Sequence, residues 1–220
     1  MRGCRKAASA FYGTCNVYID GFNLYYGCVK NTPFKWLDLA RFSAKLLPAG
    51  HQLQRIYYYK ARVRGLPHDP DAPTRQQIYL RALATIPNLT ISYGHFLTST
   101  IRMPLANPTP GVPATVSVIK TEEKGSDVNL ASHLLLHAFR KECEAAFVIS
   151  NDSDLLEPIR IVRNEFGLRV GVASPHKRPS QVLMKEASFF RSIRVGALRA
   201  SQFPQTLTDA NGTFTKPTSW

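Results

Sequence analysis

The sequence predicts an α/β fold in which a mainly parallel central sheet is covered by helices on both faces. Three mostly apolar runs, at residues 16–20, 145–150 and 168–173, have the length of buried strands. Segments with helical periodicity, at 126–142 and 154–166, precede the last two runs. Strands that are apolar on both faces are typical of parallel sheets packed between helices. The 220 residues, 44% of them hydrophobic, suit one domain with a substantial core.

The first part of the chain supplies alternating strands and helices. Residues 16–20 form a largely apolar run that ends in an acid and is followed by glycine, which indicates a buried strand. Apolar residues at helical spacing predict a helix over 36–47. A strand rich in tyrosine and isoleucine is expected at 53–61, and a helix at 74–84.

The middle of the chain is rich in β-forming residues. Two such segments, 89–103 and 114–121, flank a loop over 104–113 that contains four prolines and one glycine. This composition predicts the tip of a hairpin, and the length of the loop makes it a candidate for a mobile functional element.

The second half contains the clearest helix, over 126–142. Ser126 is its expected N-cap. One apolar face is formed by Val128, Ala131, Leu135 and Ala138, with Leu134 and Phe139 beside it. After it we expect a strand at 145–150, a helix at 154–166, a strand at 168–173, a helix at 180–187 and a last strand at 189–195.

The two ends differ from this core. We divide the chain into a basic N-terminal arm (1–14), an α/β domain (15–195) and a polar C-terminal tail (196–220) that is expected to pack loosely or be disordered. No apolar run approaches the ~20 residues of a membrane helix. The four cysteines, Cys4, Cys15, Cys28 and Cys143, form no CxxC pair and lack zinc-ligand spacing. Reduced thiols, with Cys15 and Cys143 buried beside strands, suit the cytoplasm.

The charge balance points to a polyanionic partner. The chain has 28 Lys and Arg against 15 Asp and Glu, a net charge of +13. RNA, DNA and an acidic membrane face would all be attracted, and charge alone favours nucleic acid without choosing between RNA and DNA. The sequence does not decide whether the protein is a monomer or a homo-oligomer.

Four aspartates are expected at one edge of the sheet. Asp20 closes the first strand, Asp152 follows the strand at 145–150, and Asp127 and Asp154 begin helices. Functional sites of parallel sheets lie at the carboxyl ends of the strands. Taken singly, Asp127 and Asp154 are better explained as helix caps, and a turn is the alternative role for Asp152. Asp20 fits either role less well, because it follows a strand expected to be fully buried.

Carboxylates packed together repel one another unless a cation compensates. Their hard oxygen atoms suit Mg²⁺ or Mn²⁺, which can activate a water molecule and stabilise the leaving oxygen in phosphodiester hydrolysis. The sequence therefore predicts a metal site formed by Asp20, Asp127, Asp152 and Asp154. Glu122 and Glu123 are near enough in sequence to be spare ligands, but we expect neither to bind the metal.

Neighbouring polar residues have predicted supporting roles. Asn23 is expected to hydrogen-bond a ligand carboxylate or metal-bound water, and Ser150 and Ser153 to orient Asp152; a turn or cap is the alternative for Asn23. The residues expected to contact nucleic-acid phosphates are Lys124, Lys177, Arg178, Arg62 and Arg64, with a solvated side chain as the alternative for Lys124. For Tyr57, Tyr58 and Tyr59 we expect packing in the core, with base stacking by one of the rings as the alternative.

Three motifs resemble those of NYN domains, in the LabA-like branch of the PIN-like nucleases. Residues 17–24 (VYIDGFNL) resemble the opening motif, 124–128 (KGSDV) the central Lys-Gly-x-Asp-Val segment, and 150–155 (SNDSDL) the Ser-x-Asp-Ser-Asp-Phe signature. The resemblance spans roughly residues 15–195, and its one departure is Leu155, where an aromatic residue is common. It implies a PIN-like three-layer α/β/α sandwich and a metal-dependent ribonuclease. It also maps the acidic site onto Asp20, Asp127, Asp152 and Asp154, supported by Asn23.

Other functions are less well supported. A non-catalytic RNA-binding or adaptor module on the same fold is the main alternative. A phosphatase would be expected to carry Asp-x-Asp at the first strand, but residue 22 is Phe. The sequence contains no GxxxxGK[ST] loop of a P-loop NTPase and no G-x-S-x-G elbow to accompany His133 and His137. We expect these two histidines to be exposed or packed rather than catalytic.

Overall fold

The computed structural model describes residues 13–65, 67–108, 110–111 and 113–220. Its centre is a seven-stranded sheet with the order β4-β3-β2-β1-β5-β6-β7, in which only the β3–β4 pair is antiparallel. The mainly parallel sheet is thus confirmed. Its strands are β1 (Gly13–Asp20), β2 (His51–Ala61), β3 (Leu89–Pro104), β4 (Thr115–Lys124), β5 (Ala145–Ile149), β6 (Arg169–Ser174) and β7 (Phe189–Ser192).

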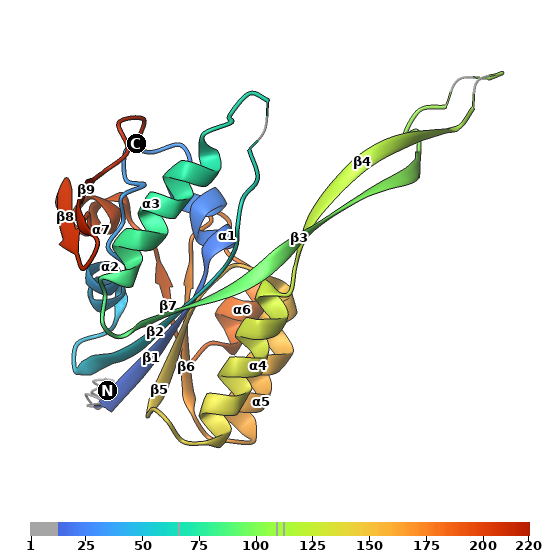
Figure 1. Cartoon of the computed structure of the whole chain (residues 1–220). Helices are drawn as coiled ribbons and strands as arrows, with labels where there is room; N and C mark the ends of the chain where they lie inside the picture. Colours follow the sequence, from blue (N-terminus) through green and yellow to red (C-terminus); the bar gives the residue numbers. More distant parts are fainter. Residues whose placement is uncertain (1–12, 66, 109, 112) are drawn as a thin grey trace.

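Helices cover both faces of the sheet and complete the expected three-layer α/β/α sandwich (Figure 1). One face carries α1 (Gly21–Leu24), the π-helix η1 (Tyr25–Val29), α2 (Leu39–Leu46), α3 (Ala72–Ala84) and α7 (Val195–Arg199). The other carries α4 (Ser126–Phe139), the 3₁₀ turn η2 (Ser153–Leu155), α5 (Leu156–Asn164) and α6 (Gln181–Glu186).

The three consecutive tyrosines of β2 divide between these two cores. Tyr58 packs on the α2–α3 side, whereas Tyr57 and Tyr59 pack on the α4–α5 side. This follows from the alternation of side chains along a strand. All three are buried, so the interpretation as core residues is confirmed.

Local capping explains where two helices begin. The helix expected from residue 36 starts only at Leu39, because the carboxylate of Asp38 accepts hydrogen bonds from the amides of Ala40 and Arg41 at 2.9 and 3.0 Å. Ser126 is not the N-cap of α4; that position belongs to Gly125, whose φ of 92° lets the chain turn from β4 into the helix.

The buried stripe of α4 is also rotated from the expected one. It is centred on Leu130 and Leu134, which are fully buried, together with Ala138. Val128 is 67% exposed and Phe139 70% exposed, so these two residues of the expected apolar surface lie outside the core. The seven-residue spacing of Val128 and Leu135 matched the helical period, but only contact with the sheet selects which stripe is buried.

The C-terminal segment packs on the domain, and the expected loose tail is wrong. Leu198, Phe203 and Phe214 are buried in the core beside α2 and α3. The indole nitrogen of Trp36 donates a hydrogen bond of 2.7 Å to the Pro204 carbonyl. The segment contains α7 and a hairpin of β8 (Thr206–Asp209) and β9 (Gly212–Thr215). Its few apolar residues are too widely spaced to produce a periodic pattern.

The N-terminal arm falls largely outside the described residues, apart from Gly13 and Thr14, which belong to β1. The hairpin expected around the proline-rich loop is present: β3 and β4 pair over ten residues each and project far from the domain (Figure 1). None of the helices in the described part of the chain combines the length and apolar character needed to cross a bilayer.

Candidate functional site

The strand order creates a switch point between β1 and β5. From β1 the chain adds β2 and β3 on one side of the sheet, and later β5, β6 and β7 on the other. Ligands of open α/β sheets bind outside the carboxyl ends of the strands at such a point. The β1–β5 pairing ends at Ile19 and Ile149, so Asp20 and Ser150 are the next residues on either side.

Asp20 is held rigidly at this position. It is only 2% exposed, and its Oδ1 accepts the amide hydrogen of Asn23 at 2.9 Å. Its Oδ2 accepts hydrogen bonds from the Asn23 side-chain amide at 2.7 Å and from the Ser150 hydroxyl at 2.8 Å. Asn23 and Ser150, both predicted as supporting residues, thus lie directly against the buried carboxylate.

Asp152 and Asp154 follow on the adjacent loop. The Asp152 amide donates to the Ser150 hydroxyl at 3.1 Å, and Asp152 Oδ1 accepts the amide hydrogen of Asp154 at 3.0 Å. Asp20 and Asp152 therefore each cap a short helix. Capping is not the role of Asp127 or Asp154, the two aspartates for which the sequence favoured it. Ser153 is exposed, and within the described residues its side chain makes no hydrogen bond that would orient Asp152.

Asp127, in the first turn of α4, interacts electrostatically with the other three aspartates. Desolvation of its carboxyl group and, after that, the charges of Asp20, Asp152, Glu123 and Asp154 raise its pKa to about 6. Burial likewise raises the pKa of Asp20, an effect that its hydrogen bonds to Asn23 and Ser150 oppose and the charge of Asp152 reinforces. All four predicted aspartates therefore interact where the strands end, and we call this group of Asp20, Asp127, Asp152 and Asp154 the acidic edge.

The donor chemistry of this edge fits a hard divalent cation. The groups are carboxylate and amide oxygens, the ligands that Mg²⁺ and Mn²⁺ prefer, and their repulsion is what a cation would relieve. Across the described residues, no three His, Cys, Asp or Glu side chains already converge on one metal position. The site is thus a set of neighbouring carboxylates rather than a closed cage.

Asn151 connects this loop to the loop after β6, a role that the sequence did not indicate. Its amide donates to Asn23 Oδ1 at 3.2 Å. Its Oδ1 accepts hydrogen bonds from the Ser174 hydroxyl at 2.9 Å and the Ser180 amide at 2.7 Å. Its Nδ2 donates to the Arg178 carbonyl at 3.3 Å. Only its position inside the SNDSD motif could have drawn attention to it.

Only some of the five predicted cations lie near the acidic edge. Lys177 and Arg178 are exposed on the loop that Asn151 fastens to the acidic site. Lys124, just before α4, lies 3.6 Å from Glu122, which also pairs with Lys120 at 2.8 Å. Two predicted cations lie elsewhere: the Arg62 guanidinium stacks 4.9 Å from the Tyr93 ring, and Arg64 lines a separate pocket beside α3.

Glu123, which we do not expect to bind the metal, interacts electrostatically with Asp20. Burial is the first cause that raises its pKa, and the charge of Asp20 raises it further. Its carboxylate accepts a short hydrogen bond from the Ser126 hydroxyl, and the charge of Lys60 opposes the increase. Glu123 thus stands between the acidic edge and the pocket beside α3.

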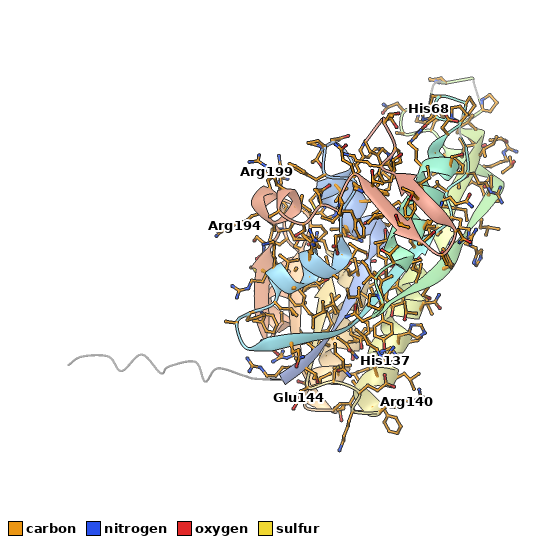
Figure 2. All side chains as sticks on the ribbon, turned by 60° about the vertical axis from the view of Figure 1, so that its left-hand side comes forward. His68, His137, Arg140, Glu144, Arg194 and Arg199 are labelled. Atoms are coloured by element: carbon orange, nitrogen blue, oxygen red, sulfur yellow. The ribbon has the colours of Figure 1, made fainter. Side chains whose placement is uncertain are left out.

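Both α4 histidines pack against tyrosines of the core: the Nδ1 atom of His133 lies 3.1 Å from the Tyr59 hydroxyl. His137, at the last turn of α4, lies with Arg140 and Glu144 at the end of the molecule opposite His68 (Figure 2). Its ring packs 4.4 Å from that of Tyr57, and its Nδ1 lies 3.0 Å from the Tyr18 hydroxyl. His137 is therefore packed, as expected.

Comparison with known protein families agrees with the resemblance of the three motifs. A model of the NYN domain matches residues 14–194. The chain belongs to the NYN domain family. NYN domains are part of the PIN-like nuclease superfamily, and the aspartates of the acidic edge occupy the family motifs quoted from this sequence.

Two further similarities accompany the family match. The chain is 28% identical to a Pseudomonas putida (strain DSM 28022 / S16) protein named 6-hydroxy-3-succinoylpyridine 3-monooxygenase, over 93% of this chain and 74% of that protein. A crystal structure of a protein of unknown function from Vibrio parahaemolyticus RIMD 2210633 has a TM-score of 0.54 and 14% identity, covering 86% of this chain and 97% of the other. This second similarity concerns the fold alone.

Proposed function

We propose that this NYN domain is a metal-dependent ribonuclease that hydrolyses RNA phosphodiester bonds at the acidic edge. The observation that carries the proposal is the gathering of Asp20, Asp127, Asp152 and Asp154 at the switch point between β1 and β5. A helix cap does not require carboxylates from three separate segments to interact. A site for a divalent cation does, because several oxygen ligands must share one charge.

In this proposal the four aspartates hold Mg²⁺ or Mn²⁺, which when bound would supply an activated water and stabilise the leaving oxygen. Asn23 and Ser150 keep the Asp20 carboxylate oriented through three hydrogen bonds. Asn151 keeps the β5 and β6 loops together, so that the acids and the adjacent cations hold a fixed arrangement.

Positive charge outside the acidic edge would bind the RNA backbone. We assign phosphate contacts to Lys177 and Arg178, which lie on the loop fastened by Asn151, and to Lys124. The net charge of +13 supports binding of a polyanion, with RNA as the proposed partner and DNA as a comparison. The free thiols of Cys15, Cys28 and Cys143 suit a cytoplasmic protein.

A cleavage assay tests this function. Labelled single-stranded and structured RNA is incubated with the protein in Mn²⁺, Mg²⁺ or EDTA. We expect cleavage that requires metal and falls at least ~100-fold in Asp152→Asn, the scale typical of removing one key catalytic interaction. Glu165→Gln is the matched control, because Glu165 is an exposed acid at the end of α5, on the far side of the domain from the acidic edge. Metal-independent cleavage that survives in Asp152→Asn would rule the proposal out.

The adaptor alternative predicts a different outcome for the same protein. It would bind RNA with a steep dependence on salt and would not cleave it at any metal concentration. Filter binding at rising salt, run beside the cleavage assay, separates the two functions.

A second candidate function is an enzyme acting on a small aromatic acid. The name of the Pseudomonas putida relative assigns such a substrate to that protein. The observation in this chain that favours the candidate is an aromatic pocket beside α3 that is lined by cationic side chains. Turnover of an aromatic acid without any action on RNA would favour it over the ribonuclease.

A further inference from the structure

A pocket of about 260 Å³ lies next to the acidic edge, on the face of the sheet that carries α1, η1 and α3. It is enclosed by α1, η1 and α3 and by the loop between β2 and α3, where Figure 2 labels His68. Gly21 and Phe22, the residues directly after Asp20, form part of its wall. The volume is slightly below the ~300 Å³ at which pockets for drug-sized ligands begin, so it suits a small ligand.

Aromatic rings dominate the wall. Phe22 stacks on Tyr26 with ring centroids 5.3 Å apart, and Tyr25 meets Tyr26 edge-on at 5.2 Å. Tyr58 completes the wall from β2. Its ring fits there because residue 21 is glycine: a Cβ at that position would lie 2.8 Å from a Tyr58 ring carbon and 2.6 Å from the Tyr59 carbonyl oxygen. Such a wall favours a planar, apolar ligand.

A buried lysine faces this aromatic wall. Lys60 is 9% exposed, and its ammonium lies 5.0 Å from the centre of the Tyr25 ring and 6.0 Å from that of Phe22. Within the described part of the chain it forms no ion pair; Glu123 acts on it only at longer range. Rings replace only part of the hydration that a buried ammonium loses, so this charge is undercompensated.

The other cations of the pocket differ in how far they are engaged. Arg75 pairs with Asp69, and Lys30 lies 4.7 Å from the Tyr26 ring. Lys35 and Arg64 also line the pocket, and neither forms an ion pair among the described residues. The surplus of positive charge inside an aromatic wall favours a ligand that carries both a ring and an anionic group.

We propose that this pocket binds a small planar aromatic anion, with its ring among Phe22, Tyr25 and Tyr58 and its anionic group at Lys60. An aromatic carboxylic acid and a single nucleotide share this chemistry. The inference is independent of RNA cleavage. It supplies a ligand site for the second candidate function but rests on the geometry of the pocket.

Isothermal titration of the full chain tests the inference. The probes are benzoate and 4-oxo-4-phenylbutanoate, with acetophenone as the neutral aromatic control, succinate as the non-aromatic control, and uridine 5′-monophosphate as the nucleotide. We expect an aromatic acid or the nucleotide to bind with a Kd below ~1 mM, at least tenfold tighter than both controls. Tighter binding of the nucleotide than of the acids would identify a nucleotide as the natural ligand, and the reverse would identify an aromatic acid.

Two variants place the ligand. Lys60→Met, which keeps the length of the side chain without its charge, is expected to weaken binding at least tenfold, whereas Lys45→Met, at an exposed lysine of α2, leaves it unchanged. Tyr25→Leu, which removes a ring that is not in the fully buried core, gives a second test and is expected to weaken binding about fivefold, roughly the value of one aromatic contact.

Equal binding of the controls, no binding of any probe, or unchanged affinity in a folded Lys60→Met protein would overturn the proposal. The titration contains neither RNA nor metal, so its failure leaves the ribonuclease proposal standing.

Discussion

At the scale of residues, burial and then repulsion from neighbouring carboxylates raise the pKa of Asp127. Its pKa of about 6 means that the folded protein resists ionising this carboxyl group, while in the unfolded chain the group ionises near its ordinary value. The stabilisation from the protonated form is complete at pH values below that ordinary value and is lost as the pH rises through about 6. At neutral pH, Asp127 therefore destabilises the metal-free fold.

Asp127→Asn is expected to increase the free energy of unfolding at pH 7 in EDTA by about 0.5–1 kcal/mol. This is well below the ~3 kcal/mol implied by a pKa change from 3.8 to about 6, because Asp127 is exposed and solvent screens its charge. Urea unfolding measures the difference. Added Mn²⁺ should then stabilise the wild-type protein more than the variant. A variant less stable than wild type in EDTA would show that the carboxylates do not repel one another.

Lys60 gives the opposite dependence on pH. Burial lowers its pKa to about 8, whereas the unfolded lysine titrates near 10.5. Between these values the unfolded chain binds more protons, so the contribution of Lys60 to stability increases as the pH rises. Lys60→Met should be more stable than wild type at pH 7 by about 1–3 kcal/mol, and the difference should shrink toward pH 10. Unfolding curves at several pH values measure it, and a difference independent of pH would contradict the buried charge.

Some residues of the site could be predicted from sequence and others could not. The four aspartates were predictable, because each stands at the end of a buried strand or the start of a helix. Lys60 and Asn151 were not. Lys60 continues a tyrosine-rich strand, and only the packing of α1 and η1 over it encloses its ammonium. The importance of Asn151 depends on a loop 23 to 29 residues away in sequence.

At the scale of elements, the C-terminal hairpin is part of the fold. Arg81 of α3 donates two hydrogen bonds of 2.7 Å to Asp209 of β8, and its guanidinium lies 4.2 Å from the Phe214 ring of β9. These contacts were invisible in the sequence, where the segment is polar and interrupted by prolines and glycine. The strands β1, β5 and β6 were predictable because their apolar runs are continuous.

Phe214→Ala should therefore reduce the free energy of unfolding by about 2–4 kcal/mol, the usual loss when a buried phenylalanine is truncated. Thr215→Ala, at the exposed neighbouring position, should change it by less than about 0.5 kcal/mol. Thermal unfolding of both variants distinguishes them. Equal melting temperatures would mean that the hairpin is only loosely attached.

At the scale of the whole molecule, strand order places opposite charges side by side. The switch point between β1 and β5 brings the aspartates together, while the chain as a whole carries a net charge of +13. The sandwich was predictable because parallel, fully buried strands admit few architectures. The pocket was not, because several separate segments form its wall and no single stretch of sequence contains its pattern.

The central claim is that the acidic edge cleaves RNA with a bound metal, and the single-turnover cleavage rate of Asp20→Asn tests it most directly. One labelled RNA is bound at equal occupancy by wild type and variant in saturating Mn²⁺. The account predicts RNA affinity within about threefold of wild type and a cleavage rate lower by at least ~100-fold. Equal cleavage rates would contradict it, because the buried carboxylate at the switch point would then have no part in the chemistry.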